Sequence, residues 1–306
     1  AKLGLAPEEV LVASTGVIGQ PLPMEKVKQG IELAVAALSK AGGREAVEAI
    51  MTTDTKPKEI AVSFSLQGRE VTLGAMAKGA GMIHPNMATM LCFITTDAAV
   101  APEALHRALQ RAVDATFNML TVDGDTSTND SVLVLANGLA GNEELNEGSD
   151  GYEDFVEALT YVCRDLARKI AADGEGATKL LEVVVKNAPS LQDARLVAKA
   201  VASSNLVKTA LFGEDANWGR VLCAAGYSGA RFDPEKVDIY LQSRAGRIQT
   251  AARGAGLPFD EEAAARILKE QEITFVLDLQ AGDAEATAYS CDFSYDYVRI
   301  NADYRT

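Results

Sequence analysis

The chain has 306 residues, of which 48% are hydrophobic and 24% charged, a composition typical of globular proteins. Its 29 basic and 43 acidic side chains give a net charge of −14, which argues against a nucleic-acid partner, because phosphate binding needs an excess of Lys and Arg. No apolar run is long enough to cross a bilayer, and residues 1–12 lack the features of a signal peptide. We therefore expect a cytoplasmic globular protein without a nucleic-acid or membrane partner.

Cysteine and histidine are rare in this sequence. The four cysteines form no C-x-x-C motif and stand in apolar or helical contexts, which predicts buried free thiols in a reducing compartment. They are Cys92, Cys163, Cys223 and Cys291. The only histidines are His84 and His106, so a His-rich metal site is excluded and no metal is predicted.

Five elements are expected in the first hundred residues. Apolar residues that recur every three or four positions indicate helices, and alternating or continuous apolar runs indicate strands. The elements are a helix from Met24 to Lys40, a shorter helix from Ala46 to Ile50, a strand from Lys58 to Leu66, a partner strand near Val71 and Leu73, and a buried strand from Thr89 to Thr96.

The rest of the chain continues to mix helices and strands. We expect a helix opening at Pro102, a strand from Val132 to Leu135, an exposed loop from Asn137 to Gly151, a long helix through Phe155 and Ile170, a strand from Leu180 to Val185, and a helix capped by Ser190 and Asp193. Two further strands, Ile273–Leu279 and Thr287–Phe293, flank a turn at Gly282-Asp283 and predict a hairpin. This order predicts a layered α/β or α+β fold.

Four stretches are not explained by packing alone. They are Ser14–Gly19 (STGVIG), Lys78–Leu91 (KGAGMIHPNMATML), Thr121–Asp130 (TVDGDTSTND) and Phe212–Arg220 (FGEDANWGR). In the third stretch, Asp123 and Asp125 stand one residue apart, a spacing that suits either a Mg²⁺ or Ca²⁺ ion or an Asx-rich turn. Of these two readings we favour the turn.

The second stretch is the most informative about chemistry. Gly79 and Gly81 permit unusual backbone angles and close approach of a ligand, and Pro85 restricts the backbone around it. Thr89 begins the expected buried strand, so its hydroxyl is a candidate nucleophile that would attack the carbonyl of Ala88 and release a chain starting at Thr89. The freed α-amine, with a pKa of about 7.7–8.0, would then be a base for the hydroxyl. The alternative, which spacing alone favours, is that Thr89 is an ordinary β-branched strand residue.

The stretch KGAGMIHPNMATML closely resembles the self-cleavage segment of the ornithine acetyltransferase family, also called bifunctional glutamate N-acetyltransferases. Further matches follow in order along essentially the whole chain: STGVIGQPLP, MTTDT, TVDGDTSTND, DGEGATK, FGEDANWGR and NADYRT. Family members carry an N-terminal segment before the STGVIG loop that is absent from this sequence. Two positions depart from the pattern, namely Ala80, where serine is common, and His84, at a variable position.

The resemblance implies roles for particular residues. Thr89 would be the nucleophile, cleavage would fall between Ala88 and Thr89, and Thr15 with Gly16 would form the oxyanion hole. The positions that match substrate-binding residues are Thr52, Lys78, Thr89, Glu175, Asn301 and Thr306. We hypothesise that Lys78 pairs with the carboxylate of an amino-acid substrate and Glu175 with an ammonium group. No catalytic role is carried over for Asp123, Asp125, Asp130 or the segment around Trp218, which are assigned to the scaffold.

The resemblance also implies an activity and an architecture. The activity is transfer of acetyl from N2-acetyl-L-ornithine to L-glutamate through acetyl-Thr89, in arginine biosynthesis, with no cofactor and with acetyl-CoA as a further donor in some members. The fold is a layered α-β-β-α body of the aminopeptidase/ornithine acetyltransferase type. Residues 1–88 would be the C-terminal part of an α chain and residues 89–306 a β chain intertwined with it, with two copies of each in the assembly.

Two other functions remain open at this stage. One is a self-processed aminopeptidase or amide hydrolase on the same scaffold, in which water takes the acyl group. Glu175, Asn301 and Thr306 argue against it, because they match the amino-acid site. The other is a non-catalytic binding or assembly protein that has kept the fold.

Overall fold

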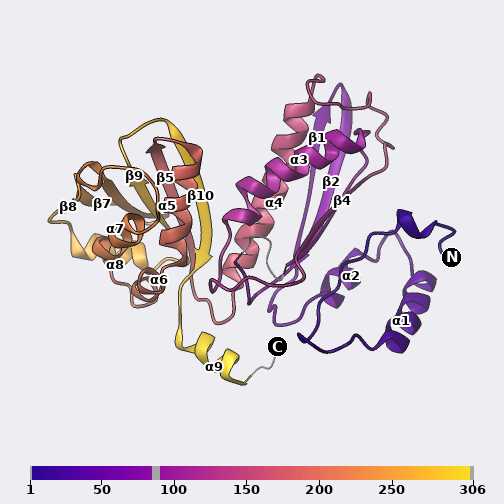
Figure 1. Ribbon diagram of the computed structural model, residues 1–306, viewed down its shortest axis with the longest axis horizontal. Helices are drawn as coiled ribbons and strands as arrows, with labels where there is room; N and C mark the ends of the chain where they lie inside the picture. Colours follow the sequence, from indigo (N-terminus) through magenta and orange to yellow (C-terminus); the bar gives the residue numbers. More distant parts are fainter. Residues whose placement is uncertain (1, 85–89, 304–306) are drawn as a thin grey trace.

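Two β-sheets with flanking helices make up the structure, a computed structural model that describes residues 2–84 and 90–303 (Figure 1). The α-helices are α1 (Met24–Ala36), α2 (Gly43–Ala49), α3 (Pro102–Ala115), α4 (Tyr152–Ala172), α5 (Leu191–Ser203), α6 (Asn205–Phe212), α7 (Trp218–Gly226), α8 (Glu261–Leu268) and α9 (Tyr295–Asp303). The strands are β1 (Lys58–Leu66), β2 (Arg69–Lys78), β3 (Leu91–Thr96), β4 (Ser131–Ala136), β5 (Leu180–Ala188), β6 (Asp238–Ser243), β7 (Gly246–Ala252), β8 (Ala255–Gly256), β9 (Glu272–Asp278) and β10 (Ala284–Cys291). The expected mixed α/β class is confirmed.

The first sheet has four strands in the order β1-β2-β3-β4. β1 and β2 form the expected hairpin, and its turn places Gln67 and Gly68 at positive φ. β3 runs antiparallel to β2 and parallel to β4. The buried side chains of this sheet, such as Val71, Leu73 and Ile94, share a core with α3 and α4, and α4 packs on β1 and β2.

The second sheet has six strands in the order β10-β5-β9-β6-β7-β8. The expected hairpin of the last two strands is wrong, because β5 lies between them, parallel to β9 and antiparallel to β10. The connection from β9 to β10 crosses the end of β5, where a Cβ on Gly282 would clash with the carbonyl of Ala188. β5 lies between β10 and β9, and its side chains Leu181, Val183 and Val185 are fully buried in a core shared with α5.

Helix α4 connects the two sheets (Figure 1). Besides β1 and β2 it contacts β5 and β10 of the second sheet. Leu180, Tyr289 and Cys291 of the second sheet belong to the same buried cluster as the apolar face of α4. The C-terminal end of α4 therefore lies where both sheets can contribute residues to one site.

The N-terminal helix differs from expectation. α1 ends at Ala36 rather than Lys40, and none of its residues is buried; Ile31 and Leu33 are exposed. The periodic apolar positions predicted a helix correctly, but they do not show whether another surface covers its apolar face. Among residues 2–84 and 90–303, no helix is both long and apolar enough to span a bilayer.

The cysteine expectation holds in part. All four thiols are free, and Cys92, Cys163 and Cys291 are buried. Cys223 is exposed, which corrects the prediction for that residue. It lies on α7, whose buried side chains Val221, Ala224 and Ala225 occupy the other side of the helix.

Candidate active site

A pocket of about 510 Å³ forms where distant segments meet near the end of α4. Its lining residues are Thr15, Gly16, Val17, Ile18, Thr52, Thr53, Lys78, Gly81, Met82, Asp123, Asp125, Thr126, Ser127, Thr128, Asn129, Glu175, Tyr297 and Asn301. The sequence-predicted residues within this lining are Thr15, Gly16, Thr52, Lys78, Glu175 and Asn301. The others, Ala88, Thr89 and Thr306, lie outside the described residues.

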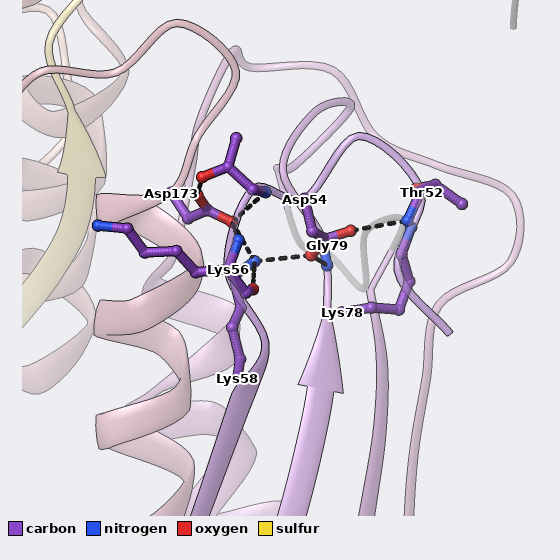
Figure 2. A network of polar contacts seen from close by, with 8 residues as sticks. Thr52, Asp54, Lys56, Lys58, Lys78, Gly79 and Asp173 are labelled. Atoms are coloured by element: carbon purple, nitrogen blue, oxygen red, sulfur yellow. Dashed lines mark hydrogen bonds and ion pairs between the residues drawn. The ribbon is translucent and has the colours of Figure 1, made fainter. Parts of the chain in front are cut away.

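Lys78 is the last residue of β2, and its side chain is almost fully buried. Its ammonium nitrogen donates a hydrogen bond to Thr52 Oγ1 at 2.8 Å, which brings two predicted substrate residues into contact (Figure 2). Burial lowers the pKa of Lys78 below its ordinary value, although nearby carboxylates oppose that shift. Of the lining residues that the structure describes, Lys78 is the one basic side chain.

Glu175 follows the C-terminal end of α4 and faces the segment after β2. Its backbone N–H donates to the carbonyl of Ala80 at 2.8 Å, and its carboxylate accepts a hydrogen bond from Asn301 Nδ2 at 2.9 Å. A Cβ on Gly81 would overlap the Glu175 carboxylate. The close approach expected at Gly81 is therefore made by a side chain of this chain, and glycine is needed there for Glu175 to occupy its place.

The aspartate-rich stretch between η2 (Phe117–Met119) and β4 forms one wall of the pocket. Asp123 accepts hydrogen bonds from the backbone N–H groups of Met82 (2.7 Å), Ile83 (2.9 Å) and Asp125 (3.2 Å). The bond from Asp125 confirms the expected Asx turn. The scaffold assignment was incomplete, however, because Asp123 and Asp125 also line the pocket. Burial raises the pKa of Asp123.

Asp130 holds the start of β3. Its Oδ1 accepts a hydrogen bond from the N–H of Met90, the residue that follows Thr89, at 3.0 Å. Its Oδ2 is buried and has no hydrogen-bond partner among residues 2–84 and 90–303. Burial raises the pKa of Asp130 to about 6, although the Met90 N–H and the charge of Lys78 oppose the shift. Asp130 directly follows the lining residue Asn129, so this bond joins the start of the β3 segment to the segment that forms the pocket wall.

Sequence reasoning missed Tyr297 as a lining residue. It lies four residues before Asn301 on α9, whose Asn301 Nδ2 also donates to the Tyr297 carbonyl at 3.1 Å. Residues four apart on a helix share a face, so the position of Asn301 was the signal that would have found Tyr297. The Trp218 segment is not among the described lining residues of this pocket, and the indole of Trp218 packs against Gly256 of β8.

Within the described part of the chain, the pocket lining contains one ammonium group and three carboxylates. Lys78 provides the cation, and Asp123, Asp125 and Glu175 provide the anions. A small zwitterion such as an amino acid carries complementary groups, and the Thr15–Gly16 loop adds a hydroxyl and backbone at the rim. Fold and site together define a mixed α/β protein with a pocket whose charged groups are complementary to those of a small zwitterion.

Comparison with known proteins identifies the family. The model of the ArgJ family matches residues 1–306, so the chain belongs to the ArgJ family. The arginine biosynthesis bifunctional protein ArgJ of Symbiobacterium thermophilum is 62% identical over 304 residues, which are 99% of this chain and 75% of that protein. The protein of the same name from Thermotoga neapolitana is 56% identical over 305 residues, covering 100% of this chain and 77% of the relative.

A solved structure agrees with this assignment. The crystal structure of the arginine biosynthesis bifunctional protein ArgJ from Bacillus halodurans matches with a TM-score of 0.66 and 46% sequence identity. The match covers 69% of this chain and 98% of the solved chain. At this identity the likeness supports both the fold and the family.

Proposed function

We propose that this chain is an acetyltransferase of arginine biosynthesis that moves acetyl from N2-acetyl-L-ornithine to L-glutamate. One observation carries the proposal: six residues predicted from the family pattern, coming from five separate segments of the chain, line a single pocket. The relatives described above carry the name arginine biosynthesis bifunctional protein, which supports the proposal.

The first half-reaction would load acetyl onto Thr89. The Thr89 hydroxyl oxygen attacks the acetyl carbonyl of N-acetylornithine, while the free α-amine of Thr89 takes the hydroxyl proton. Thr15 Oγ1 and the Gly16 N–H are proposed to donate hydrogen bonds to the resulting oxyanion. The intermediate collapses by breaking the C–N bond, the α-amine of Thr89 returns its proton to the leaving nitrogen, and ornithine departs.

The second half-reaction would reverse these steps with a different amine. The neutral α-amino group of glutamate attacks the acetyl ester, and Thr89 leaves as its hydroxyl. The substrate α-carboxylate is proposed to pair with Lys78, and an ammonium group of ornithine with Glu175. Asn301 would orient the Glu175 carboxylate through their 2.9 Å hydrogen bond. We also propose that Thr52 and Thr306 contribute to substrate binding.

Thr89 has a free α-amine only if the chain is cut after Ala88. We therefore propose self-cleavage into residues 1–88 and 89–306, by attack of the Thr89 hydroxyl on the Ala88 carbonyl and hydrolysis of the resulting ester. The size of the solved relative supports this: it matches 69% of 306 residues, or about 211, near the size of the stretch from 89 to 306. The two fragments would remain one intertwined body.

The proposal needs no metal or other cofactor, because a hydroxyl nucleophile, an amine base and an oxyanion hole complete the chemistry. We propose an assembly of two α and two β chains, as the family resemblance implies. We also place the enzyme in the cytoplasm, where the three buried free thiols stay reduced. An assay with acetyl-CoA in place of N-acetylornithine would show whether the chain accepts acetyl-CoA as an acetyl donor.

The proposal is tested by mass spectrometry and kinetics on wild type and Thr89→Ala. Wild type is expected as two fragments, with one acetyl group added to the fragment 89–306 after incubation with N-acetylornithine alone, and with ping-pong kinetics. Thr89→Ala is expected to remain one inactive chain. Cleavage of the Ala variant without added protease, or sequential kinetics with no acetylated fragment, would contradict the proposal. Release of free acetate without glutamate would indicate the hydrolase instead.

A further inference from the structure

Asp54, Lys58 and Asp173 form a buried charge network close in sequence to residues that line the pocket (Figure 2). Lys58 Nζ is 2.6 Å from Asp54 Oδ1 and 2.5 Å from Asp173 Oδ2. The side chains of Lys58 and Asp54 are 1% and 0% exposed, and that of Asp173 is 7% exposed. None of the three is among the lining residues, so the proposed chemistry does not use them directly.

The network ties together three parts of the chain. Asp54 Oδ1 also accepts a hydrogen bond from the N–H of Gly79 at 2.7 Å, and Oδ2 accepts one from the N–H of Thr52 at 3.1 Å. Asp173, the C-cap residue of α4, accepts backbone hydrogen bonds from residues 55 and 56 at 3.0 and 3.3 Å. The loop before β1, the end of β2 and the end of α4 are thus joined through Lys58.

Each of the three chain segments joined by the network also carries a residue that lines the pocket. Thr52 is itself held by Asp54, Lys78 directly precedes Gly79, and Glu175 lies two residues after Asp173. Thr52 and Lys78 are further joined by their 2.8 Å hydrogen bond. The network therefore bonds the backbone at Thr52 and directly after Lys78, and it includes a residue two positions before Glu175.

Stability alone is a weak reason for such a network. Burying charges costs free energy, and apolar residues of similar volume often stabilise a core equally well or better. Burial raises the pKa of Asp54, but the bonds from Gly79, Lys58 and Thr52 outweigh it, so the pKa lies below its usual value and the carboxylate stays charged. Charge-assisted hydrogen bonds are directional, and apolar contacts are not, so the network fixes orientation as well as distance.

We infer that Asp54, Lys58 and Asp173 are positioning residues that set Thr52, Lys78 and Glu175 for the amino-acid substrate. This role rests on the proposed function of the pocket. The three residues touch no reacting atom and act through the backbone of their neighbours. Misplacing Thr52 and Lys78 weakens the binding of substrate and transition state alike, which raises KM and leaves kcat nearly unchanged.

The test uses the full chain with Asp54→Asn, which keeps the side-chain shape but puts an amide NH₂ where the carboxylate accepts a hydrogen bond. We expect faster amide hydrogen exchange in peptides covering residues 51–56 and 78–84, and unchanged exchange in β6 and β7. We expect KM for N-acetylornithine to rise about tenfold, as for the loss of one hydrogen bond to a charged group, with kcat per folded molecule little changed. The control is Glu153→Gln, which breaks an exposed ion pair with Arg111 between α4 and α3.

A folded Asp54→Asn protein with wild-type exchange in these peptides and wild-type KM would overturn the inference. A lowered melting temperature of the variant with an unchanged KM would also overturn the inference, because the network would then contribute only to stability. If Asp54→Asn fails to fold, the same exchange and kinetic measurements are made on Asp173→Asn. Asp173 is the most exposed member of the network, so its substitution disturbs folding least. A wild-type enzyme without transferase activity would refute the proposed function, and the exchange data would still decide whether the network positions the two segments.

Discussion

At the scale of single residues, the proposed oxyanion hole depends on one hydroxyl. Thr15 lines the pocket within a loop whose turn is closed by a hydrogen bond from the Gln20 N–H to the Val17 carbonyl at 3.1 Å. Its side chain either donates to the oxyanion or only shapes this turn. Valine distinguishes these roles, because it keeps the volume and β-branching of threonine and removes the hydroxyl.

Thr15→Val is expected to lower kcat by about 10²–10³ with little change in KM, since the lost bond forms mainly in the transition state. Steady-state kinetics on protein whose cleavage at residue 88 has been verified by mass spectrometry measure this effect. Wild-type kcat in the cleaved variant would assign the hole to the Gly16 N–H alone.

Asp130 makes stability depend on pH. Its pKa is raised from 3.8 to about 6 in the folded protein, so the folded state binds this proton more tightly than the unfolded chain does. The contribution of Asp130 to the free energy of unfolding is therefore greatest below pH 4 and is lost as the pH rises towards 6. Asn cannot titrate and keeps an acceptor for the Met90 N–H.

Asp130→Asn is thus expected to gain stability relative to wild type as the pH rises from 4 to 7. Urea unfolding at several pH values, followed by circular dichroism, measures the difference between the two proteins. A difference that is constant across this range would show that Asp130 has an ordinary pKa in the folded state.

At the scale of elements, the pocket depends on how the ends of β2 and α4 meet. The backbone bond from Glu175 to Ala80 joins these ends, and the Glu175 carboxylate occupies the space that Gly81 leaves free. Neither element contains the site by itself. The carboxylate of Glu175 lines the pocket because these two ends are in contact.

Gly81→Ala is expected to push the Glu175 carboxylate out of its place. Because that carboxylate is the end of a flexible side chain, stability should change little, while KM for N-acetylornithine should rise at least several-fold. Kinetics together with a thermal melt separate these effects, and Gly30→Ala, in open space on α1, is the matched control. An unchanged KM would mean that Glu175 does not bind substrate from this position.

At the scale of the whole molecule, the proposed cut falls between two paired strands. β2 precedes residue 88 and β3 follows it, and they form an antiparallel ladder from Leu73 opposite Thr96 to Lys78 opposite Leu91. β1 and β2 also pack on α4, which belongs to the later fragment. A cut after Ala88 would leave this sheet and its core shared by both fragments.

The two fragments are therefore expected to elute together in gel filtration and to separate only in denaturant. Buried apolar surface and the β-ladder hold them without a covalent link. Uncut Thr89→Ala protein provides the reference elution volume. Separate elution of the two fragments under native conditions would contradict a shared sheet.

Local pattern predicted the elements but not how they pair. β1 was predicted to the residue and α4 closely, because alternation and helical periodicity are local properties. The insertion of β5 between β9 and β10 was not predictable, since neighbours in sequence are the default partners and only the shared core with α5 selects otherwise. The exposure of α1 and Cys223 was not predicted either, because exposure also depends on which distant segments cover a side chain.

The sequence by itself determined the family, the candidate nucleophile and the residue types of the site, because the motifs around Thr15, Lys78 and Glu175 are contiguous and specific. Only the tertiary structure decided that Asp123, Asp125 and Tyr297 join them, and that a buried lysine, Lys58, pairs with both Asp54 and Asp173. Local sequence fixes backbone conformation, whereas burial and distance between charges depend on segments more than a hundred residues apart, such as Lys58 and Asp173.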